Sequence, residues 1–512
     1  MKKLLVVFVA IALVISSTAC GGSKPANSEA THLTVEIFDR GNMPESYGDP
    51  TNNFWTNYIH DTMLEKFNID VEFVAIPRSE ETNKITALIA SGDEPDIFYT
   101  YEYNFMCQLA EQGALADLTE SLNNCGKDII EYLGDDVLPY GQYKGVQYSI
   151  NTRRVGTSML CSYIRKDWLD ALNIEVKERN GVASMTPSEL YSAMTKIKEA
   201  GYCKYPFAVL KEWQSIMPIE GAFLDADDCD ETTISKLCNF KYMLSACSDM
   251  GVKEAYRFLN KCYNDGLINP DFPLYKYENI GEWVASNQCA FWTGTTWQFM
   301  GANENLASLY SSNPEAEVIA IEICNEDGGS AYYKQYAPVG SWVMVSSECE
   351  NIDAAITYLN WMLSDEAHMM LSHGVEGEHW KYNEDGLITV IDSNHNNETR
   401  ISVEDIYMFG VGDPCEKFNT NTAVTEIEKK LDKLNTSAKL IGGTGKWHNK
   451  YIGGLKMPGK YTLEVTENLE RLIVSSIMAE SGSFDSVYDT NHEKFLNEGG
   501  QQIIDEALEA EK

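Results

Sequence analysis

Tryptophan and tyrosine are plentiful in this sequence, and their side chains could serve binding chemistry. The chain holds ten tryptophans and 28 tyrosines. A sugar presents flat C–H faces and many hydroxyl groups, so a site for it needs aromatic rings for stacking and planar polar groups for hydrogen bonds. The composition therefore suits a sugar-binding site. The alternative is that most of these rings pack in the core or on the surface.

Motifs for catalysis, redox chemistry and metal binding are missing from the sequence. No Gly-x-Ser-x-Gly and no Cys-x-x-Cys occurs, and His492-Glu493 lacks the second histidine of a zinc protease motif. The acid-rich segment 225–231 lacks the glycine and terminal glutamate of an EF-hand loop. We therefore expect no catalytic residue, no metal and no cofactor. The 77 acidic residues always offer carboxylate pairs, so their number neither supports nor excludes a glycoside hydrolase.

The first nineteen residues have the pattern of a secretory signal. Two lysines precede an apolar run from Leu4 to Ile15, and small residues follow up to Cys20. Twelve apolar residues rise only about 18 Å as a helix, too little to span a hydrocarbon core of roughly 30 Å. Cys20 and the glycines after it resemble a bacterial lipobox. We expect residues 1–19 to be removed, Cys20 to be acylated and residues 20–31 to form a flexible tether; the alternative is an unmodified Cys20.

Length and charge restrict what the rest of the chain can be. A body of nearly five hundred residues predicts two or more lobes, because single hydrophobic cores stop growing at about 250–300 residues. A net charge of −37 argues against nucleic acid as a partner. It also suggests a ligand that is not strongly anionic, although a local cluster of arginines would reverse that. Of the thirteen cysteines, those after Cys20 fit either disulfides or buried free thiols.

Strand and helix patterns alternate along the first part of the chain, which predicts an α/β fold. The expected strands cover residues 33–38, 71–76 and 95–99, and the expected helices cover residues 53–67 and 81–90. Such an alternation predicts a mostly parallel sheet covered by helices. Further helices are expected at residues 166–173, 186–200, 235–265 and 352–373.

Ligands of such sheets bind beyond the carboxyl ends of the strands, so the loops after Phe38 and Tyr99 are candidate sites. We expect five side chains there to contact the ligand: Asp39, Arg40, Tyr99, Tyr101 and Glu102. The acidic and basic groups would bond hydroxyls, and the tyrosines would stack.

Six sequence blocks, in order, resemble those of extracellular solute-binding proteins of carbohydrate ABC transporters, in their large Gram-positive lipoprotein branch. The blocks are SGDEPDI with LAEQGALADLT (from Ser91 and Leu109), YIRKDWLDAL (from Tyr163), TPSEL (from Thr186), DGLINPDF (from Asp265), QCAFWTGTTW (from Gln288) and HGVEGEHW (from His373). The resemblance extends from about Leu33 to the C-terminus.

The resemblance implies a two-lobed periplasmic-binding-protein-like fold of type II, with the ligand cleft between the lobes and hinge strands crossing between them. The implied segments are residues 32–152 in the first lobe, 153–286 in the second, 287–340 in the first again, and 341–512 in the second with hinge-spanning elements. Ligand binding to both lobes would favour a closed state.

The resemblance also implies partners and a location. An oligosaccharide would be captured on the extracellular face of the cell membrane by a lipid-anchored monomer and delivered to the permease subunits of an ABC importer. The alternatives are a surface-anchored glycoside hydrolase and a binder of a non-sugar solute such as a peptide.

Four further ligand contacts are expected from the same comparison. Trp297 follows a strand and a glycine-containing turn where sugar binders of this family place a stacking ring, and Trp213 lies in a second aromatic loop. Arg153 and its neighbour Arg154 lie in the expected hinge strand, where either could instead pair with a carboxylate. Trp380 is the fourth. Among the other tryptophans, Trp342 is a weaker candidate that could be core, and Trp168 and Trp361 are expected in the core because their apolar neighbours have helical spacing.

Overall fold

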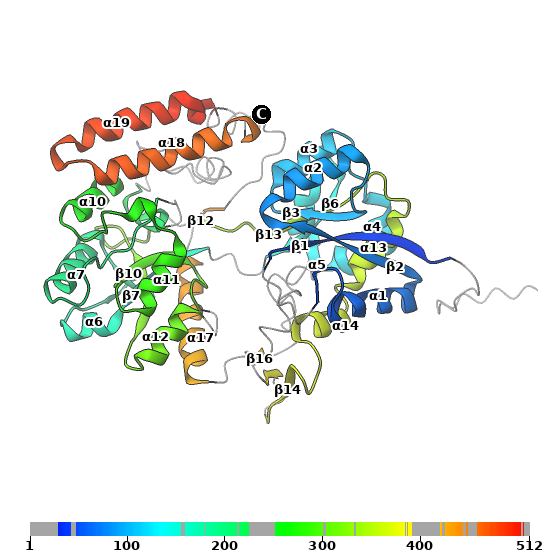
Figure 1. Cartoon of the computed structure of the whole chain (residues 1–512), viewed down its shortest axis with the longest axis horizontal. Helices are drawn as coiled ribbons and strands as arrows, with labels where there is room; N and C mark the ends of the chain where they lie inside the picture. The colour runs from blue at the N-terminus through cyan, green and yellow to red at the C-terminus, as the bar shows by residue number, and fades with distance from the viewer. Residues whose placement is uncertain are drawn as a thin grey trace, which may run out of the picture.

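Two lobes, each built on its own mixed sheet, make up the computed structural model of this chain (Figure 1). The structure describes residues 29–41, 48–154, 159–179, 181–211, 215–224, 251–300, 304–331, 334–384, 386, 388–391, 420–421, 425–443, 447–448, 458–502 and 505. Cys20, the signal segment and Trp213 lie outside these residues, as do the acid-rich segment 225–231 and most of the tether.

The first lobe contains a five-stranded sheet in the order β2-β1-β3-β13-β6. β1 pairs in parallel with β2 and β3, as the alternating pattern predicted, whereas β13 runs antiparallel to both β3 and β6. β1 buries Leu33, Val35 and Ile37 completely because helices cover the sheet. The elements of this lobe are β1 (Thr31–Asp39), α1 (Phe54–Phe67), β2 (Ile69–Pro77), α2 (Glu81–Ser91), β3 (Ile97–Thr100), α3 (Tyr103–Glu111), α4 (Thr119–Cys125), α5 (Lys127–Val137), the hairpin β4 (Gln142–Tyr143) and β5 (Val146–Gln147), β6 (Ser149–Arg153), β13 (Val339–Val345), α13 (Ile352–Trp361) and α14 (Asp365–His368).

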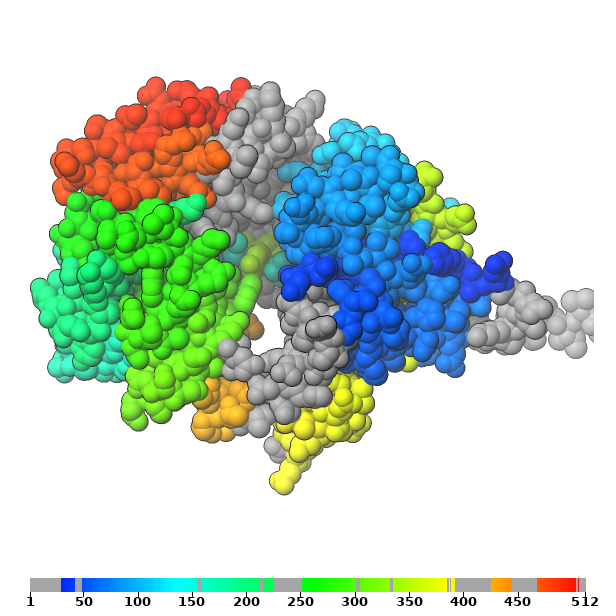
Figure 2. All heavy atoms as spheres, viewed as in Figure 1, coloured from blue at the N-terminus to red at the C-terminus, as the bar shows by residue number. Residues whose placement is uncertain are grey.

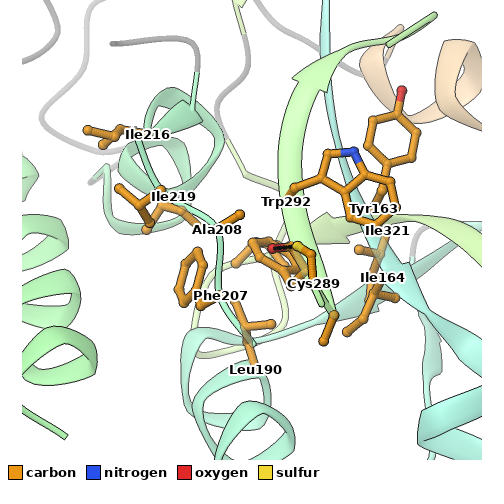
Figure 3. Packing of buried hydrophobic residues seen from close by; sticks show 14 of the residues in the cluster. Tyr163, Ile164, Leu190, Phe207, Ala208, Ile216, Ile219, Cys289, Trp292 and Ile321 are labelled. Atoms are coloured by element: carbon orange, nitrogen blue, oxygen red, sulfur yellow. Dashed lines mark hydrogen bonds between the residues drawn. The ribbon is translucent and has the colours of Figure 1, made fainter. Parts of the chain in front are cut away.

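The second lobe contains a sheet in the order β10-β7-β11-β9-β8. β7, the second strand in this order, is antiparallel to both β10 and β11. Tyr163 of β7 and Trp292 of β10 are stacked, with ring centroids 5.5 Å apart, inside the core drawn in Figure 3. The elements are β7 (Leu160–Arg165), α6 (Lys166–Ala171), β8 (Lys177–Arg179), β9 (Val182–Met185), α7 (Pro187–Glu199), α8 (Met217–Phe223), α10 (Val252–Asn264), α11 (Tyr277–Ala285), β10 (Phe291–Thr295), α12 (Asn305–Ser312), β11 (Val318–Ile323), α17 (Glu426–Gly442), α18 (Pro458–Met478) and α19 (Phe484–Phe495).

Small elements complete the fold. A three-stranded sheet contains β14 (Trp380–Tyr382), β15 (Ile388–Val390) and β16 (Thr420–Asn421), and β12 (Lys334–Gln335) pairs with β17 (Trp447–His448). Single helical turns are η2 (Arg78–Glu80), η3 (Leu138–Gly141), η7 (Phe272–Leu274), η8 (Met369–His373), η9 (Ser481–Ser483) and η10 (Leu496–Gly500). Among the described residues, no helix has both the length and the apolar character needed to cross a bilayer.

The chain crosses between the lobes at places that differ in part from those expected. The first crossing agrees: β6 ends at Arg153 in the first sheet and β7 begins at Leu160 in the second. The next two segments are reversed, however. Residues 287–340 were expected in the first lobe, yet β10 and β11 pair with β7, and this core continues to Ala331.

The segment expected in the second lobe from residue 341 begins instead in the first. β13 inserts between β3 and β6, and α13 and α14 extend the first core to Leu371. The physical reason is strand pairing over long distances: β10 and β11 bury apolar side chains on both faces only when they flank β7. The last crossing therefore lies between α14 and α17.

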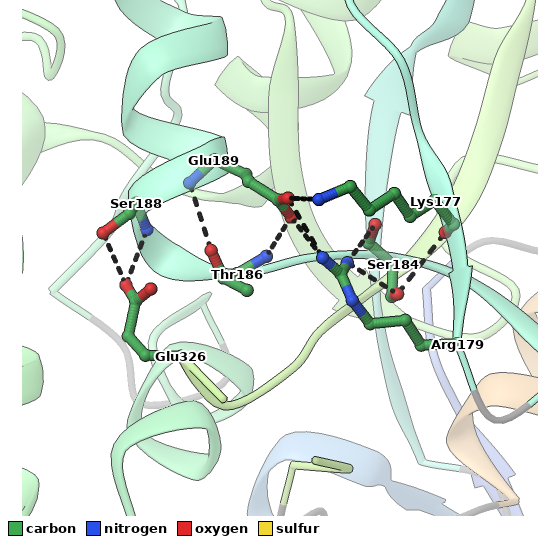
Figure 4. Close-up of polar contacts among 7 residues, drawn as sticks. All are labelled: Lys177, Arg179, Ser184, Thr186, Ser188, Glu189 and Glu326. Atoms are coloured by element: carbon green, nitrogen blue, oxygen red, sulfur yellow. Dashed lines mark hydrogen bonds and ion pairs between the residues drawn. The ribbon is translucent and has the colours of Figure 1, made fainter. Parts of the chain in front are cut away.

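Local signals in the sequence are found where they were expected. In α7, Thr186 accepts a hydrogen bond from the Glu189 N–H at 3.2 Å, and the Glu189 carboxylate accepts one from the Thr186 N–H at 3.0 Å (Figure 4). This capping box was expected from the sequence. Trp168 and Trp361 are 7% and 4% exposed, which confirms their core positions.

Candidate ligand-binding site

The carboxyl ends of the first lobe's parallel strands face the second lobe. β1 enters from the outer side of its lobe and runs toward the other lobe in Figure 1, and β2 and β3 are parallel to it. On the face shown in Figure 2 the surface is hollowed between the two lobes. Two groups of side chains belong to this region, one at the ends of β1, β2 and β3 and one where the crossing segments meet the second lobe.

The first group, here the first-lobe cluster, consists of Phe38, Arg78, Tyr99, Tyr101 and Glu81. Phe38 contacts both tyrosines, with its ring centroid 4.4 Å from that of Tyr99 and 6.1 Å from that of Tyr101, and the two tyrosine rings contact each other at 6.4 Å. The Arg78 guanidinium carbon lies 5.0 Å from the Phe38 ring centroid and 4.6 Å from that of Tyr101. Phe38 and Tyr99 are buried, so Tyr101 and the Arg78 guanidinium are the parts of this cluster that reach the surface.

A buried carboxylate fixes the guanidinium of this cluster. Glu81 accepts a hydrogen bond from Arg78 at 2.5 Å and, on its other oxygen, one from the Thr100 hydroxyl at 2.6 Å. Beneath it, Glu36 is fully buried and accepts a hydrogen bond from the Tyr99 N–H at 2.8 Å. Burial raises the pKa of Glu36 well above its usual value, against the lowering effect of the Tyr99 hydrogen bond, and the nearby Glu81 raises it further.

The second group, here the hinge stack, consists of Trp297, Tyr336 and Arg154. The rings of Trp297 and Tyr336 are nearly parallel, at 17°, with centroids 6.1 Å apart. The Arg154 guanidinium carbon lies 4.0 Å from the centroid of the Tyr336 ring. Trp297 follows β10 of the second lobe, whereas Tyr336 and Arg154 belong to the segments that connect the lobes. The stack therefore joins a ring of one lobe to the hinge.

The turn that carries Trp297 is fixed by its backbone, while the ring itself remains half exposed. The Gln298 N–H bonds the Thr295 carbonyl at 3.0 Å, and the Asn435 side chain of α17 bonds the Thr296 carbonyl at 2.9 Å. A Cβ at Gly294 would lie 2.8 Å from the Gln298 side chain, so glycine allows this turn to pack. Trp297 keeps 49% of its surface exposed, which is unusual for so large an apolar side chain.

The structure places the other expected contacts as follows. Asp39 and Arg40 lie at the end of β1, where Asp39 accepts a hydrogen bond from the Gly41 N–H and the Arg40 guanidinium lies 6.0 Å from the Phe38 ring centroid. Tyr99 is only 5% exposed, and Glu102 is an exposed residue that precedes α3. The loops after β1 and β3 therefore come together, as their places in the sheet predicted.

Arg153 and the tryptophans at 342 and 380 have packing partners. Arg153 bonds both oxygens of Asp136 at 2.8 Å and the carbonyls of Tyr132 and Leu133. Trp380 is 6% exposed and donates to the Gly374 carbonyl at 2.9 Å. Trp342 is completely buried and donates to the Tyr140 carbonyl.

Sequence reasoning missed Arg78, Glu81 and Tyr336. The signal for Arg78 was available, because it directly follows β2, whose carboxyl end lies beside those of β1 and β3. Tyr336 follows a two-residue strand and carries no local signal. In the part of the chain that the structure describes, no group of three or more His, Cys, Asp and Glu side chains is placed to hold a metal ion.

Two cavities are found away from both groups, in the second lobe. One of about 470 Å³ lies between α17 and the segment before β11, and one of about 420 Å³ lies beside the end of α11. Neither is lined by a residue of the hinge stack or the first-lobe cluster.

Comparison with known proteins adds a family match and distant relatives. The model of a family described as bacterial extracellular solute-binding protein matches residues 48–369. The polygalacturonan/rhamnogalacturonan-binding protein YtcQ of Bacillus subtilis (strain 168) is 20% identical over 481 residues, covering 88% of this chain and 87% of the relative. Lipoprotein LipO of the same strain is 20% identical over 438 residues, covering 82% of each chain.

Solved structures share the fold. A human-milk-oligosaccharide (HMO) binding solute-binding protein associated with an ABC transporter, from Bifidobacterium longum infantis, superposes with a TM-score of 0.67 at 13% identity. The superposition covers 94% of this chain and 99% of the other. At this identity the likeness concerns the fold alone, which is the two-lobed α/β fold.

Proposed function

This chain belongs to the family of bacterial extracellular solute-binding proteins, and on that premise we propose that it captures an oligosaccharide and delivers it to an ABC importer. Delivery would require contact with the permease subunits of the transporter. We further propose that the protein acts as a monomer attached through Cys20 to the outer face of the cell membrane. The names of two relatives, a lipoprotein and a binder of galacturonans, support this proposal.

The half-exposed ring of Trp297 is the observation that carries the sugar proposal. Sugar rings bind aromatic faces through their C–H groups, and a fixed ring loses little conformational entropy when it binds. The Trp297 turn is held by α17 and by its own backbone bonds, so the ring is positioned before a ligand arrives. Tyr336 covers one side of it and leaves the rest of the indole available.

Ligand contacts from both lobes would couple binding to closure. The first-lobe cluster offers the partly exposed Tyr101 ring and the Arg78 guanidinium, and the hinge stack offers Trp297 from the second lobe. A ligand that touches both groups binds the closed state more tightly than the open one, and so shifts the population toward closure. Asp39, Arg40 and Glu102 extend the first-lobe side with groups that bond hydroxyls.

Isothermal titration calorimetry against a panel of oligosaccharides tests the proposal. We expect a glycan of the panel to bind and Trp297→Ala to weaken that binding at least about tenfold, the effect of losing one aromatic stacking contact of roughly 1.4 kcal/mol. Phe67→Ala is the matched control, because this phenylalanine is also exposed, at 41%, but ends α1 at the amino edge of the sheet. It should leave the affinity unchanged.

Two outcomes would overturn the proposal. If no glycan binds and a peptide or another solute does, the oligosaccharide assignment is wrong although the family assignment stands. If incubation with a bound glycan produces shorter products, the protein is a hydrolase. Thin-layer or mass-spectrometric analysis of the glycan after incubation detects such products.

A further inference from the structure

Among the described residues, no acidic side chain is paired with Arg154. Five other described arginines pair with carboxylates: Arg78–Glu81, Arg153–Asp136, Arg165–Asp167, Arg179–Glu189 and Arg257–Asp485. Within the described residues, the Arg154 guanidinium contacts only the Tyr336 ring, at 4.0 Å, and the Val339 carbonyl, through Nε at 3.5 Å. This is notable because acids outnumber bases by 77 to 40 in this chain.

The position of Arg154 in the fold makes the lack of a described carboxylate partner significant. Its backbone N–H bonds the Pro338 carbonyl at 2.8 Å, which fixes the residue beside the second crossing segment. Its side chain is partly buried, and a partly buried cation costs free energy unless a charge or hydrogen-bond acceptor compensates it. The Tyr336 ring covers one face of the guanidinium and supplies part of that compensation. Among the described residues, no carboxylate is paired with the N–H groups at its edge.

A carboxylate matches the N–H groups at the edge of the Arg154 guanidinium better than a hydroxyl does. The guanidinium presents parallel N–H donors with the spacing of the two oxygens of a carboxylate, and such charge-assisted pairs are about twice as strong as neutral hydrogen bonds. Trp297 also contacts Tyr336, with the two rings nearly parallel. A stacking ring and a cation thus lie within one three-residue stack.

We infer that Arg154 binds the carboxylate of an acidic sugar whose ring lies near Trp297, so that the ligand is a carboxylated oligosaccharide. This inference rests on the proposed function and narrows it to one class of glycan. The net charge of −37 repels such a ligand at long range, but that field is screened over about 8 Å at physiological salt. Short-range pairing at Arg154 then decides the specificity. The overall charge alone had suggested a ligand that is not strongly anionic, and Arg154 is the local feature that reverses this.

Calorimetry with acidic glycans and their neutral methyl esters tests the inference. The probes are hexuronate oligomers and sialylated oligosaccharides, the two sources of a sugar carboxylate, each with and without esterification. We expect the wild-type protein to bind the acid form of one source at least about tenfold more tightly than its ester. Arg154→Gln should abolish that preference, so that the acid and its ester bind this variant with equal affinity. Arg154→Lys keeps the positive charge but loses the parallel N–H donors of the guanidinium. It should therefore retain part of the preference for the acid form.

The results separate the two proposals. If neutral glycans bind in a manner that depends on Trp297 and esterification never weakens binding, the carboxylate inference is overturned and the proposed function stands. If Arg154→Gln keeps the full preference for the acid, another residue binds the carboxylate and the role of Arg154 is refuted. If no glycan binds in either form, both proposals fail. Should Arg154→Gln fold poorly, the comparison of acid and ester in the wild-type protein and in Arg154→Lys still decides.

Discussion

Glu36 is a carboxylic acid placed inside the first sheet, and its environment should make stability depend on pH. Burial raises its pKa well above the usual 4.5, so the folded state holds this proton more tightly than the unfolded chain does. Stability is therefore fully present below about pH 4.5 and falls as the pH rises toward the raised value.

Glu36→Gln should remove this loss. Between about pH 5 and about pH 8, the unfolding temperature of the variant should rise relative to that of the wild-type protein. The Gln side-chain carbonyl can still accept a hydrogen bond from the Tyr99 N–H. Glu72→Gln, at an exposed glutamate of the adjacent strand β2, is the control and should show no such gain. Equal pH dependence of Glu36→Gln and the wild-type protein would contradict the prediction.

Replacing Arg153 tests whether this residue beside the hinge stabilises the fold or contacts the ligand. Its guanidinium satisfies two backbone carbonyls of α5 and pairs with Asp136. Arg153→Ala should lower the free energy of unfolding by about 1–3 kcal/mol, because those carbonyls lose their donor. Urea unfolding measures this. A variant that unfolds normally but loses ligand affinity would show that Arg153 instead contacts the ligand.

At the scale of elements, the N-terminus of α7 combines a cap with an ion pair (Figure 4). Thr186→Ala should lower the free energy of unfolding by about 1 kcal/mol, the usual effect of losing an N-cap hydroxyl. Thr425→Ala, in the equivalent capping box of α17, is the matched control for a cap without this ion pair and should cost about the same.

Glu189 of the same cap should add a pH-dependent contribution. Burial would raise its pKa, but hydrogen bonds from Arg179 and Lys177 outweigh this and hold the pKa at about 2. A lowered folded-state pKa gives stability that is present above the usual 4.5 and is lost as the pH falls toward about 2. The difference in unfolding midpoint between wild-type protein and Glu189→Gln should therefore shrink over that range. A constant difference would show that the ion pair has no such effect.

What the sequence predicts at this scale depends on how far apart the interacting residues are. The α7 cap and the parallel order of β1, β2 and β3 were predicted, because each depends on neighbours or on successive strands. The placement of β10, β11 and β13 was not, since each pairs with strands more than a hundred residues away, as Phe291 does with Ile164. A strand-like sequence pattern does not indicate which of the two sheets the strand joins.

The same distinction governs the candidate site. Trp297 and the loops after β1 and β3 were identified because family position or strand order marks them. Tyr336 was not, since only the return of the chain to the first lobe brings it beside Trp297 and Arg154. Cysteine pairing was equally undetermined by sequence, and in the described part of the chain Cys125, Cys161, Cys203, Cys262, Cys289, Cys324 and Cys349 are free thiols.

For the whole molecule, the arrangement of crossing segments predicts motion of two rigid lobes about a narrow hinge. β6 and β13 pair with each other inside the first sheet, and the Thr152 hydroxyl accepts from the Ser341 N–H at 2.8 Å. A Cβ at Gly340 would lie 2.6 Å from that hydroxyl, so the crossing strands are tightly packed up to the edge of the first lobe. We therefore expect bending to occur outside these paired strands, between the first sheet and the second lobe.

Small-angle X-ray scattering measures this motion directly. Adding a saturating ligand should reduce the radius of gyration of the wild-type protein, because contacts from both lobes favour the closed state. At the same ligand concentration, Trp297→Ala should keep the larger radius of gyration of the open state. At higher ligand concentrations, the fraction of this variant that closes should equal the fraction that has ligand bound. Phe67→Ala should close as the wild-type protein does. Saturated binding with no change in the radius of gyration would mean that the ligand contacts one lobe only, and the first-lobe cluster and Trp297 would then belong to separate surfaces.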